Sequence, residues 1–161
     1  MNTRASTNYL SRRALLLLAL FLVVVFVVGG AIGFSTAPGE WYAGLNKPPF
    51  NPPNWLFGPV WSALYVMIAI AGWRTFLAEP NGTGMKLWYG QMVLNWLWSP
   101  TWFGLHLLWP AFVVIAAILA LILLFIANRW KRDRLSALLF LPYAAWVGFA
   151  SLLNLSIAIL N

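Results

Sequence analysis

Charged residues are scarce in this sequence, and cysteine is absent from it. Aspartate, glutamate, lysine and arginine together make up 8% of the 161 residues, about a third of the ~25% typical of soluble domains. Without cysteine the chain can form no disulfide, no cysteine-ligated metal site and no thiol-based active site. Hydrophobic residues make up 62% of the chain, so most of it must face lipid or other helices. The composition predicts a membrane protein.

No acidic or basic residue lies in the middle of any long apolar segment. Ion-coupled transporters, proton pumps and voltage sensors need such residues, and a retinal Schiff base needs a buried lysine. Glu40, Glu79 and Asp133 fall in separate loops, so no pair of carboxylates is expected. His106, the one histidine, could be a single axial haem ligand, but an interfacial histidine without that role is preferred. We predict no metal site and no required cofactor.

Five apolar segments predict five membrane-spanning helices, because a helix is the only structure other than a closed barrel that satisfies its backbone within lipid. The first is an uncharged run of 21 residues, which would span ~30 Å, the thickness of the hydrocarbon core. The expected fold class is an all-α membrane protein. A basic segment at 1–13 precedes a five-helix domain at 14–161, with helices at about 14–34, 55–77, 87–106, 111–128 and 135–160.

The first and last helices carry features with more than one interpretation. Residues 35–37 would suit a signal-peptide cleavage site, but the apolar run is too long for a usual signal peptide, which favours a retained helix. Gly29 and Gly33 form a GxxxG pattern. It indicates either a close helix contact or the ordinary glycine content of membrane helices, and both remain open. Pro142 predicts a kink in the last helix.

The net charge of +7 indicates membrane topology rather than nucleic-acid binding, because the basic residues lie between apolar segments. With five spans, nine basic residues share the side of the N-terminus: Arg4, Arg12, Arg13, Arg74, Lys86, Arg129, Lys131, Arg132 and Arg134. Only Lys47 lies on the other side. Basic residues mark the inner side, so we expect the N-terminus inside and the C-terminus outside.

The stretch from Trp41 to Tyr65 contains five prolines and three tryptophans. Paired prolines remove backbone donors and restrict φ, so the first part predicts a stiff, extended loop. Trp55 and Leu56 should convert it into the second helix. On the topology above the loop lies on the outer face. A long, rigid, aromatic loop of this kind is usually functional.

Tryptophan is abundant, and most of the eleven residues suit an interfacial belt at the span ends. Others join polar residues in stripes at helical spacing. The stripes are Trp61 and Tyr65 on the second helix, Gln91, Asn95, Trp98 and Ser99 on the third, and Tyr143, Trp146, Ala150 and Asn154 on the fifth.

These stripes have two interpretations. They could line one uncharged aromatic cavity for a large, flat, mostly apolar ligand such as a tetrapyrrole. Lys47 would then pair with a ligand carboxylate near the mouth. They could instead be ordinary helix packing, with Asn95 and Asn154 as interhelical hydrogen bonds worth ~0.6 kcal/mol each. Spacing alone favours packing.

Three motifs resemble the translocator protein family (TspO/MBR, tryptophan-rich sensory proteins). The first is W-Y-x-x-L-N-K-P-P-F-x-P-P-x-W-x-F-x-P-V-W-x-x-L-Y, from Trp41 to Tyr65. The second is Q-x-x-L-N-x-x-W-S-P, from Gln91 to Pro100. The third is P-Y-x-x-W-x-x-x-A-x-x-L-N, from Pro142 to Asn154.

The resemblance implies a five-helix bundle with a pocket under the first loop that binds porphyrins and drug-like ligands. Trp61 and Trp146 resemble the pocket tryptophans, Asn95 the polar contact, and Ala150 the small residue near the pocket. With the residues from spacing, the expected ligand-binding set is Trp41, Lys47, Trp61, Tyr65, Asn95, Trp98, Tyr143, Trp146 and Ala150.

The expected function is that of a membrane receptor or sensor that binds protoporphyrin IX or a related tetrapyrrole, in porphyrin handling or stress regulation. Two alternatives remain. One is light-dependent degradation of protoporphyrin IX, with Trp61 and Trp146 as the residues involved. The other is transport of small amphiphiles. The expected partners are the porphyrin or another flat amphiphile and the lipid bilayer, with a homodimer left open. The expected location is the bacterial cell membrane.

Overall fold

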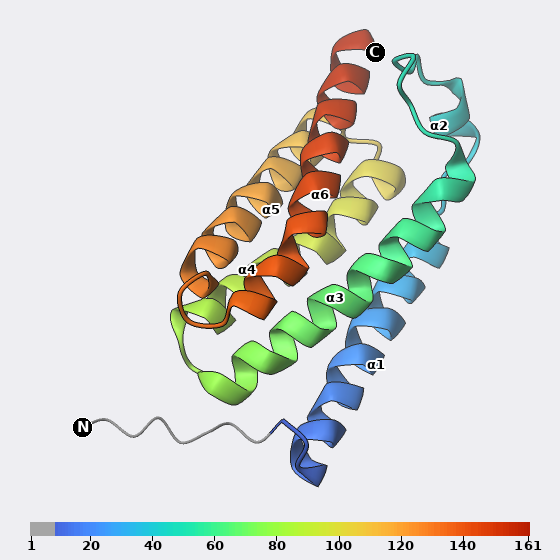
Figure 1. Ribbon diagram of the computed structural model, residues 1–161. Coiled ribbons are helices and arrows are strands. Elements are labelled where there is room, and N and C mark those ends of the chain that lie inside the picture. The colour runs from blue at the N-terminus through green and yellow to red at the C-terminus, as the bar shows by residue number, and fades with distance from the viewer. Residues whose placement is uncertain (1–8) are drawn as a thin grey trace.

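The computed structural model describes residues 9–161, and within that range every regular element is helical. The basic segment predicted at 1–13 lies mostly outside the described residues. The elements are α1 (Arg12–Ser35), α2 (Glu40–Gly44), η1 (Asn54–Leu56), α3 (Phe57–Ala78), α4 (Thr83–Ser99), η2 (Pro100–Gly104), α5 (Leu108–Arg129) and α6 (Arg134–Leu160). Figure 1 shows α1 beside α3 on one flank of the bundle, and α4, α5 and α6 together on the other.

Four helical segments of the described chain are long and apolar enough to cross a membrane: Arg12–Ser35, Asn54–Ala78, Leu108–Arg129 and Arg134–Leu160. The predicted all-helical fold is therefore confirmed, with four helices that could cross a membrane. The helix α4 has 17 residues and continues directly into η2. Its crossing of the membrane as a fifth span stays a prediction, as does the orientation of the termini.

The helix predicted at 87–106 differs from the structure at both ends. It begins at Thr83, after Gly82 in extended conformation. Its last turn widens into a π-helix from Pro100 to Gly104, closed by the Leu105 amide, which donates to the Pro100 carbonyl at 2.8 Å. His106 then has a φ of 57°, which ends the helix, because L residues rarely adopt left-handed conformations.

The paired prolines predicted an extended loop from Trp41 onward, and this is wrong for its first residues. Glu40–Gly44 form the short helix α2, which precedes the prolines, and the chain becomes extended only at Leu45. The loop that follows is tied to the far end of α6. The Asn46 amide donates to Asn161 Oδ1, and Asn161 Nδ2 donates to the Asn46 carbonyl, both at 3.0 Å. Figure 1 shows the C-terminus beside this loop.

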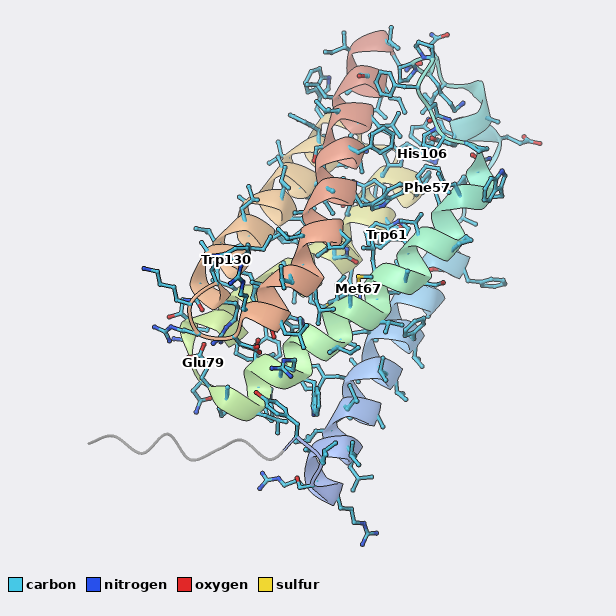
Figure 2. All side chains as sticks on the ribbon, in the orientation of Figure 1. Phe57, Trp61, Met67, Glu79, His106 and Trp130 are labelled. Carbon is cyan, nitrogen blue, oxygen red and sulfur yellow. The ribbon has the colours of Figure 1, made fainter. Side chains whose placement is uncertain are left out.

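Ion pairs join the helices at the opposite end of the bundle, near Glu79 and Trp130 in Figure 2. Arg74 of α3 makes two hydrogen bonds to Asp133, which immediately precedes α6, at 2.9 and 3.0 Å. Glu79 pairs with Arg129 and with Arg132. These contacts join α3, α5 and α6 at the end of the bundle opposite α2.

The helix α1 packs more loosely than the other long helices, with only three buried residues: Ala14, Val25 and Gly29. At one end the Trp73 indole N–H donates to the Ala14 carbonyl at 2.7 Å. Near the other end a β-carbon on Gly29 would lie 2.6 Å from the Tyr65 ring. The glycine therefore admits an aromatic ring of α3, which is a close helix contact of the kind that the GxxxG pattern left open.

Candidate functional site

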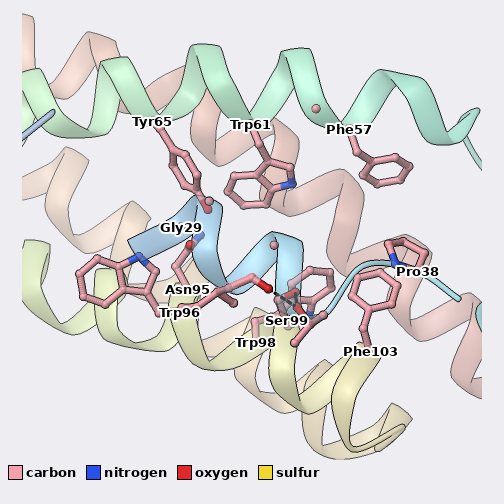
Figure 3. Close-up of a pocket in the computed structure, with 15 residues that line it drawn as sticks. Gly29, Pro38, Phe57, Trp61, Tyr65, Asn95, Trp96, Trp98, Ser99 and Phe103 are labelled. Atoms are coloured by element: carbon pink, nitrogen blue, oxygen red, sulfur yellow. Dashed lines mark hydrogen bonds between the residues drawn. The ribbon is translucent and has the colours of Figure 1, made fainter. Parts of the chain in front are cut away.

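A cavity of about 360 Å³ lies between α1, α3 and α4. Figure 3 shows aromatic side chains from α3 and α4 facing one another across it. Its lining residues are Gly29, Gly30, Ile32, Gly33, Thr36, Pro38, Phe57, Gly58, Trp61, Tyr65, Asn95, Trp96, Trp98, Ser99 and Phe103. None of these side chains carries a formal charge, so the cavity suits an apolar, aromatic occupant with few polar groups.

The α3 wall is built from residues one helical turn apart. Trp61 and Tyr65 are four residues apart, so they share one face of the helix. Their ring centroids are 5.5 Å apart with a tilt of 45°. Phe57, one turn earlier, continues the same wall. All three rings of this wall are therefore aromatic.

The α1 wall consists of glycine. Gly29 is buried under Tyr65, whereas a β-carbon on Gly30 or Gly33 would meet no atom within 4 Å. Gly30 and Gly33 are also exposed. They therefore lie on the open side of the cavity, and their missing side chains leave space that an occupant can use.

The polar part of the wall comes from α4 and is supported by α6. Asn95 Nδ2 donates to the Tyr143 hydroxyl at 3.0 Å, and that hydroxyl donates to Gln91 Oε1 at 2.9 Å. Tyr143 is fully buried and Asn95 is 7% exposed. Asn95 therefore lines the cavity, while Tyr143 and Gln91 lie behind it.

A hydrogen bond joins α4 to the end of α1 within the cavity lining. The hydroxyl oxygens of Thr36 and Ser99 are 2.7 Å apart. Because Thr36 donates its one hydroxyl hydrogen to the Ile32 carbonyl, Ser99 must be the donor to Thr36. Next to them Trp98 donates to Asn154 Oδ1 at 3.1 Å and stacks on Trp102 with centroids 6.2 Å apart.

The structure brings four of the predicted ligand-binding residues to this cavity: Trp61, Tyr65, Asn95 and Trp98. The predicted residues of α6 lie outside its lining. Trp146 contacts the cavity residue Phe57 edge-to-face, with centroids 5.7 Å apart. The Ala150 carbonyl accepts a hydrogen bond from Asn154. The α6 stripe thus packs behind the cavity wall, against α3 through Trp146 and against α4 through Tyr143; its role in ligand binding stays a prediction.

The two predicted residues of the Pro-rich loop and α2, Lys47 and Trp41, also lie outside the cavity lining. Trp41 stacks on His106, with ring centroids 4.1 Å apart. Lys47 Nζ donates to the carbonyl oxygens of Ala43 and Leu45 at 3.1 and 3.2 Å. Both residues therefore shape the loop, and a contact between Lys47 and a ligand carboxylate stays a prediction.

Sequence reasoning missed part of the lining: Gly30, Gly33, Phe57, Trp96 and Phe103. Trp96 is of interest because its indole nitrogen is buried without a hydrogen-bond partner. The GxxxG pattern marked the glycine wall, but the sequence did not show which helix it would face. Within the described range, no group of three or more His, Asp or Glu side chains is placed to hold a metal ion.

Fold and cavity together define a class: a helical membrane protein with an uncharged aromatic cavity between its helices. The chain belongs to the TspO/MBR family, whose profile matches residues 18–160. Protein CrtK of Rhodobacter capsulatus is 39% identical over 150 residues, which cover 89% of this chain and 94% of CrtK.

Two further relatives come from an archaeon and a mammal. Tryptophan-rich protein TspO of Archaeoglobus fulgidus is 40% identical over 147 residues, covering 87% of this chain and 94% of that protein. Translocator protein of Homo sapiens is 33% identical over 144 residues, covering 77% of this chain and 85% of that protein. The resemblance seen in the three motifs is thereby confirmed.

Proposed function

We propose that this protein is a receptor or sensor that binds a porphyrin such as protoporphyrin IX in the cavity between α1, α3 and α4. The observation that carries the proposal is the cavity itself: about 360 Å³, aromatic and without a charged lining residue. A flat macrocycle would stack on Trp61, Tyr65 and Phe57. The open glycine side, at Gly30 and Gly33, would leave room for its periphery.

The test fills the cavity without disturbing the fold. Gly33→Leu adds a side chain into open space on the lining. Gly148→Leu is the matched control, because a β-carbon at Gly148 also meets no atom within 4 Å and Gly148 does not line the cavity. Purified proteins are titrated with protoporphyrin IX in the dark, and quenching of tryptophan fluorescence is followed.

We expect saturable quenching in the wild type and in Gly148→Leu, and an affinity at least about tenfold weaker in Gly33→Leu, a loss of ~1.4 kcal/mol. Equal affinities in all three proteins would place the porphyrin elsewhere and overturn the proposal. Free porphyrin with empty detergent micelles gives the baseline for nonspecific partition.

The proposed topology has five spans, with the N-terminus inside and the C-terminus outside, in a bacterial cell membrane. It is supported by the basic residues at the end of the bundle opposite the α2 loop. Because the chain has no cysteine, single substitutions report sidedness directly. An impermeant maleimide applied to intact cells should label Glu40→Cys and not Lys131→Cys; the reverse pattern would invert the topology.

A second candidate function is light-dependent degradation of the bound porphyrin, favoured by the position of Trp61 in the cavity wall. Illumination of the porphyrin complex should then give products that form more slowly with Trp61→Phe at equal occupancy. Identical product yields with free porphyrin in empty micelles would reject this activity and leave binding intact.

A further inference from the structure

A chain of hydrogen bonds behind the cavity has a fixed direction. Gln91 Nε2 donates to the Trp88 carbonyl at 3.0 Å, so its other amide atom, Oε1, faces Tyr143. The Tyr143 hydroxyl has one hydrogen, which it donates to Gln91 Oε1 at 2.9 Å. The hydroxyl oxygen can therefore only accept from the next residue in the chain, Asn95.

This direction fixes the orientation of the Asn95 amide. Its nitrogen must point at Tyr143, at 3.0 Å, since a flipped amide would set two acceptors against each other. No described residue donates to Asn95 Oδ1. That oxygen is not fully buried, and Asn95 lines the cavity. The wall therefore offers a hydrogen-bond acceptor.

The neighbouring polar groups do not donate to Asn95 Oδ1. The Tyr65 hydroxyl lines the cavity and makes no hydrogen bond to Asn95 or to another described residue; because a hydroxyl can donate or accept, it sets no preference of its own. The Trp98 indole N–H is used by Asn154, and the Ser99 hydroxyl is used by Thr36. Trp96 has an unpaired N–H, but that atom is itself buried. Because an acceptor left unpaired in an apolar site costs free energy, an occupant that brings its own donor to Asn95 is favoured.

We propose that the cavity selects flat, mostly apolar ligands that carry an N–H donor on the edge facing Asn95, with Tyr143 and Gln91 as the positioning residues that set this preference. The proposal rests on the proposed function in that both use the same cavity. It adds a rule of selectivity: among ligands of equal shape, one with an N–H donor on the edge facing Asn95 binds more tightly than one with an acceptor or an apolar group there.

The test uses three tricyclic probes of nearly the same shape. Carbazole has an N–H at its bridging position, dibenzofuran an oxygen and fluorene a methylene. Binding to the full-length protein in detergent is measured by equilibrium dialysis against empty micelles of the same detergent. We expect carbazole to bind about two- to tenfold more tightly than fluorene or dibenzofuran, the range for one net hydrogen bond.

Two variants separate this preference from a general loss of structure. Asn95→Leu removes the acceptor but leaves the Tyr143–Gln91 hydrogen bond in place, so the ratio of carbazole to fluorene affinity should fall to about one. Tyr143→Phe releases the Asn95 amide, which is then free to turn, so the ratio should fall while fluorene affinity changes by less than about twofold. A ratio is insensitive to the amount of folded protein.

The outcomes distinguish this proposal from the porphyrin proposal. Weaker binding of the tricycles to Gly33→Leu would show that they bind in the cavity. If carbazole then binds no more tightly than fluorene, or if Asn95→Leu retains the carbazole preference, the selectivity rule is wrong and cavity binding stands. If no tricycle binds in the cavity, the rule is also overturned, and the porphyrin titration decides the proposed function by itself.

Discussion

The indole ring of Trp88 lies directly against the backbone of Gly72, and this contact holds α4 against α3. A β-carbon on Gly72 would lie 2.4 Å from the ring of Trp88. The indole N–H of Trp88 donates to the Ile68 carbonyl at 2.9 Å. The ring of Phe21 in α1 meets the Trp88 ring edge-to-face, with centroids 5.2 Å apart. One buried tryptophan therefore joins α1, α3 and α4.

Gly72→Ala should destabilise the protein, because the added methyl group forces the buried indole of Trp88 to move. We expect a loss of about 1–3 kcal/mol, the usual penalty for overpacking a filled core, seen as a lower thermal midpoint in detergent. Gly148→Ala is the control, since its methyl group meets open space. Equal midpoints for the two variants would show that α4 is not held at this contact.

The carboxylate of Asp133 should make stability depend on pH in the acidic range. Burial alone would raise the pKa of Asp133, but hydrogen bonds from Arg74 and Ser136 outweigh it and hold the pKa below its ordinary value of 3.8. A carboxyl with a lowered pKa in the folded state stabilises the fold above its unfolded pKa, and this stabilisation is lost as the pH falls through the folded pKa.

The expected result is a thermal midpoint that falls as the pH drops below about 4, the unfolded value. Asp133→Asn should lower the midpoint at neutral pH, by a loss of about 1–3 kcal/mol for the charged hydrogen bonds, and flatten this acidic slope. Glu40→Gln serves as the comparison, because Glu40 lies in α2, away from the ion pairs. An unchanged slope in Asp133→Asn would assign the acid sensitivity to other groups.

The two tryptophans that resemble the family's pocket residues should differ in their effect on porphyrin binding. Trp61 lines the cavity, whereas Trp146 reaches it through Phe57. Trp61→Phe should weaken protoporphyrin IX binding about two- to tenfold, the range for an aromatic pair, and Trp146→Phe should have a smaller effect. Porphyrin Soret absorbance measures both affinities without relying on tryptophan emission. A larger effect at Trp146 would move the ligand towards α6.

The sequence predicted the boundaries of those helices whose long apolar runs end at a basic turn. The segments predicted at 111–128 and 135–160 differ from α5 and α6 by at most three residues at either end. The end of α4 could not be predicted, because residue spacing indicates neither the π-helix after Ser99 nor the left-handed φ of His106, whose ring stacks on Trp41.

The candidate site could be predicted only in part. Helical spacing placed Trp61 with Tyr65, and Asn95 near Trp98, and these four residues do line the cavity. Spacing does not show which helices meet. The α6 stripe faces α4 through the Asn95–Tyr143 hydrogen bond, and the opposite wall comes from α1, whose uniformly apolar sequence marks no preferred face.

Lys47 offers a direct test of whether ligand carboxylates reach the Pro-rich loop after α2. Two of its three ammonium hydrogens are used by the Ala43 and Leu45 carbonyls, so one remains for a ligand. If Lys47 pairs with a porphyrin carboxylate, Lys47→Met should weaken binding of protoporphyrin IX about two- to fivefold, as for an exposed ion pair. Binding of the dimethyl ester should not change, because the ester carries no charge. An equal loss for acid and ester would mean that Lys47 acts only by holding the loop, through its two carbonyl contacts and its position over the Tyr42 ring, 4.7 Å from the centroid.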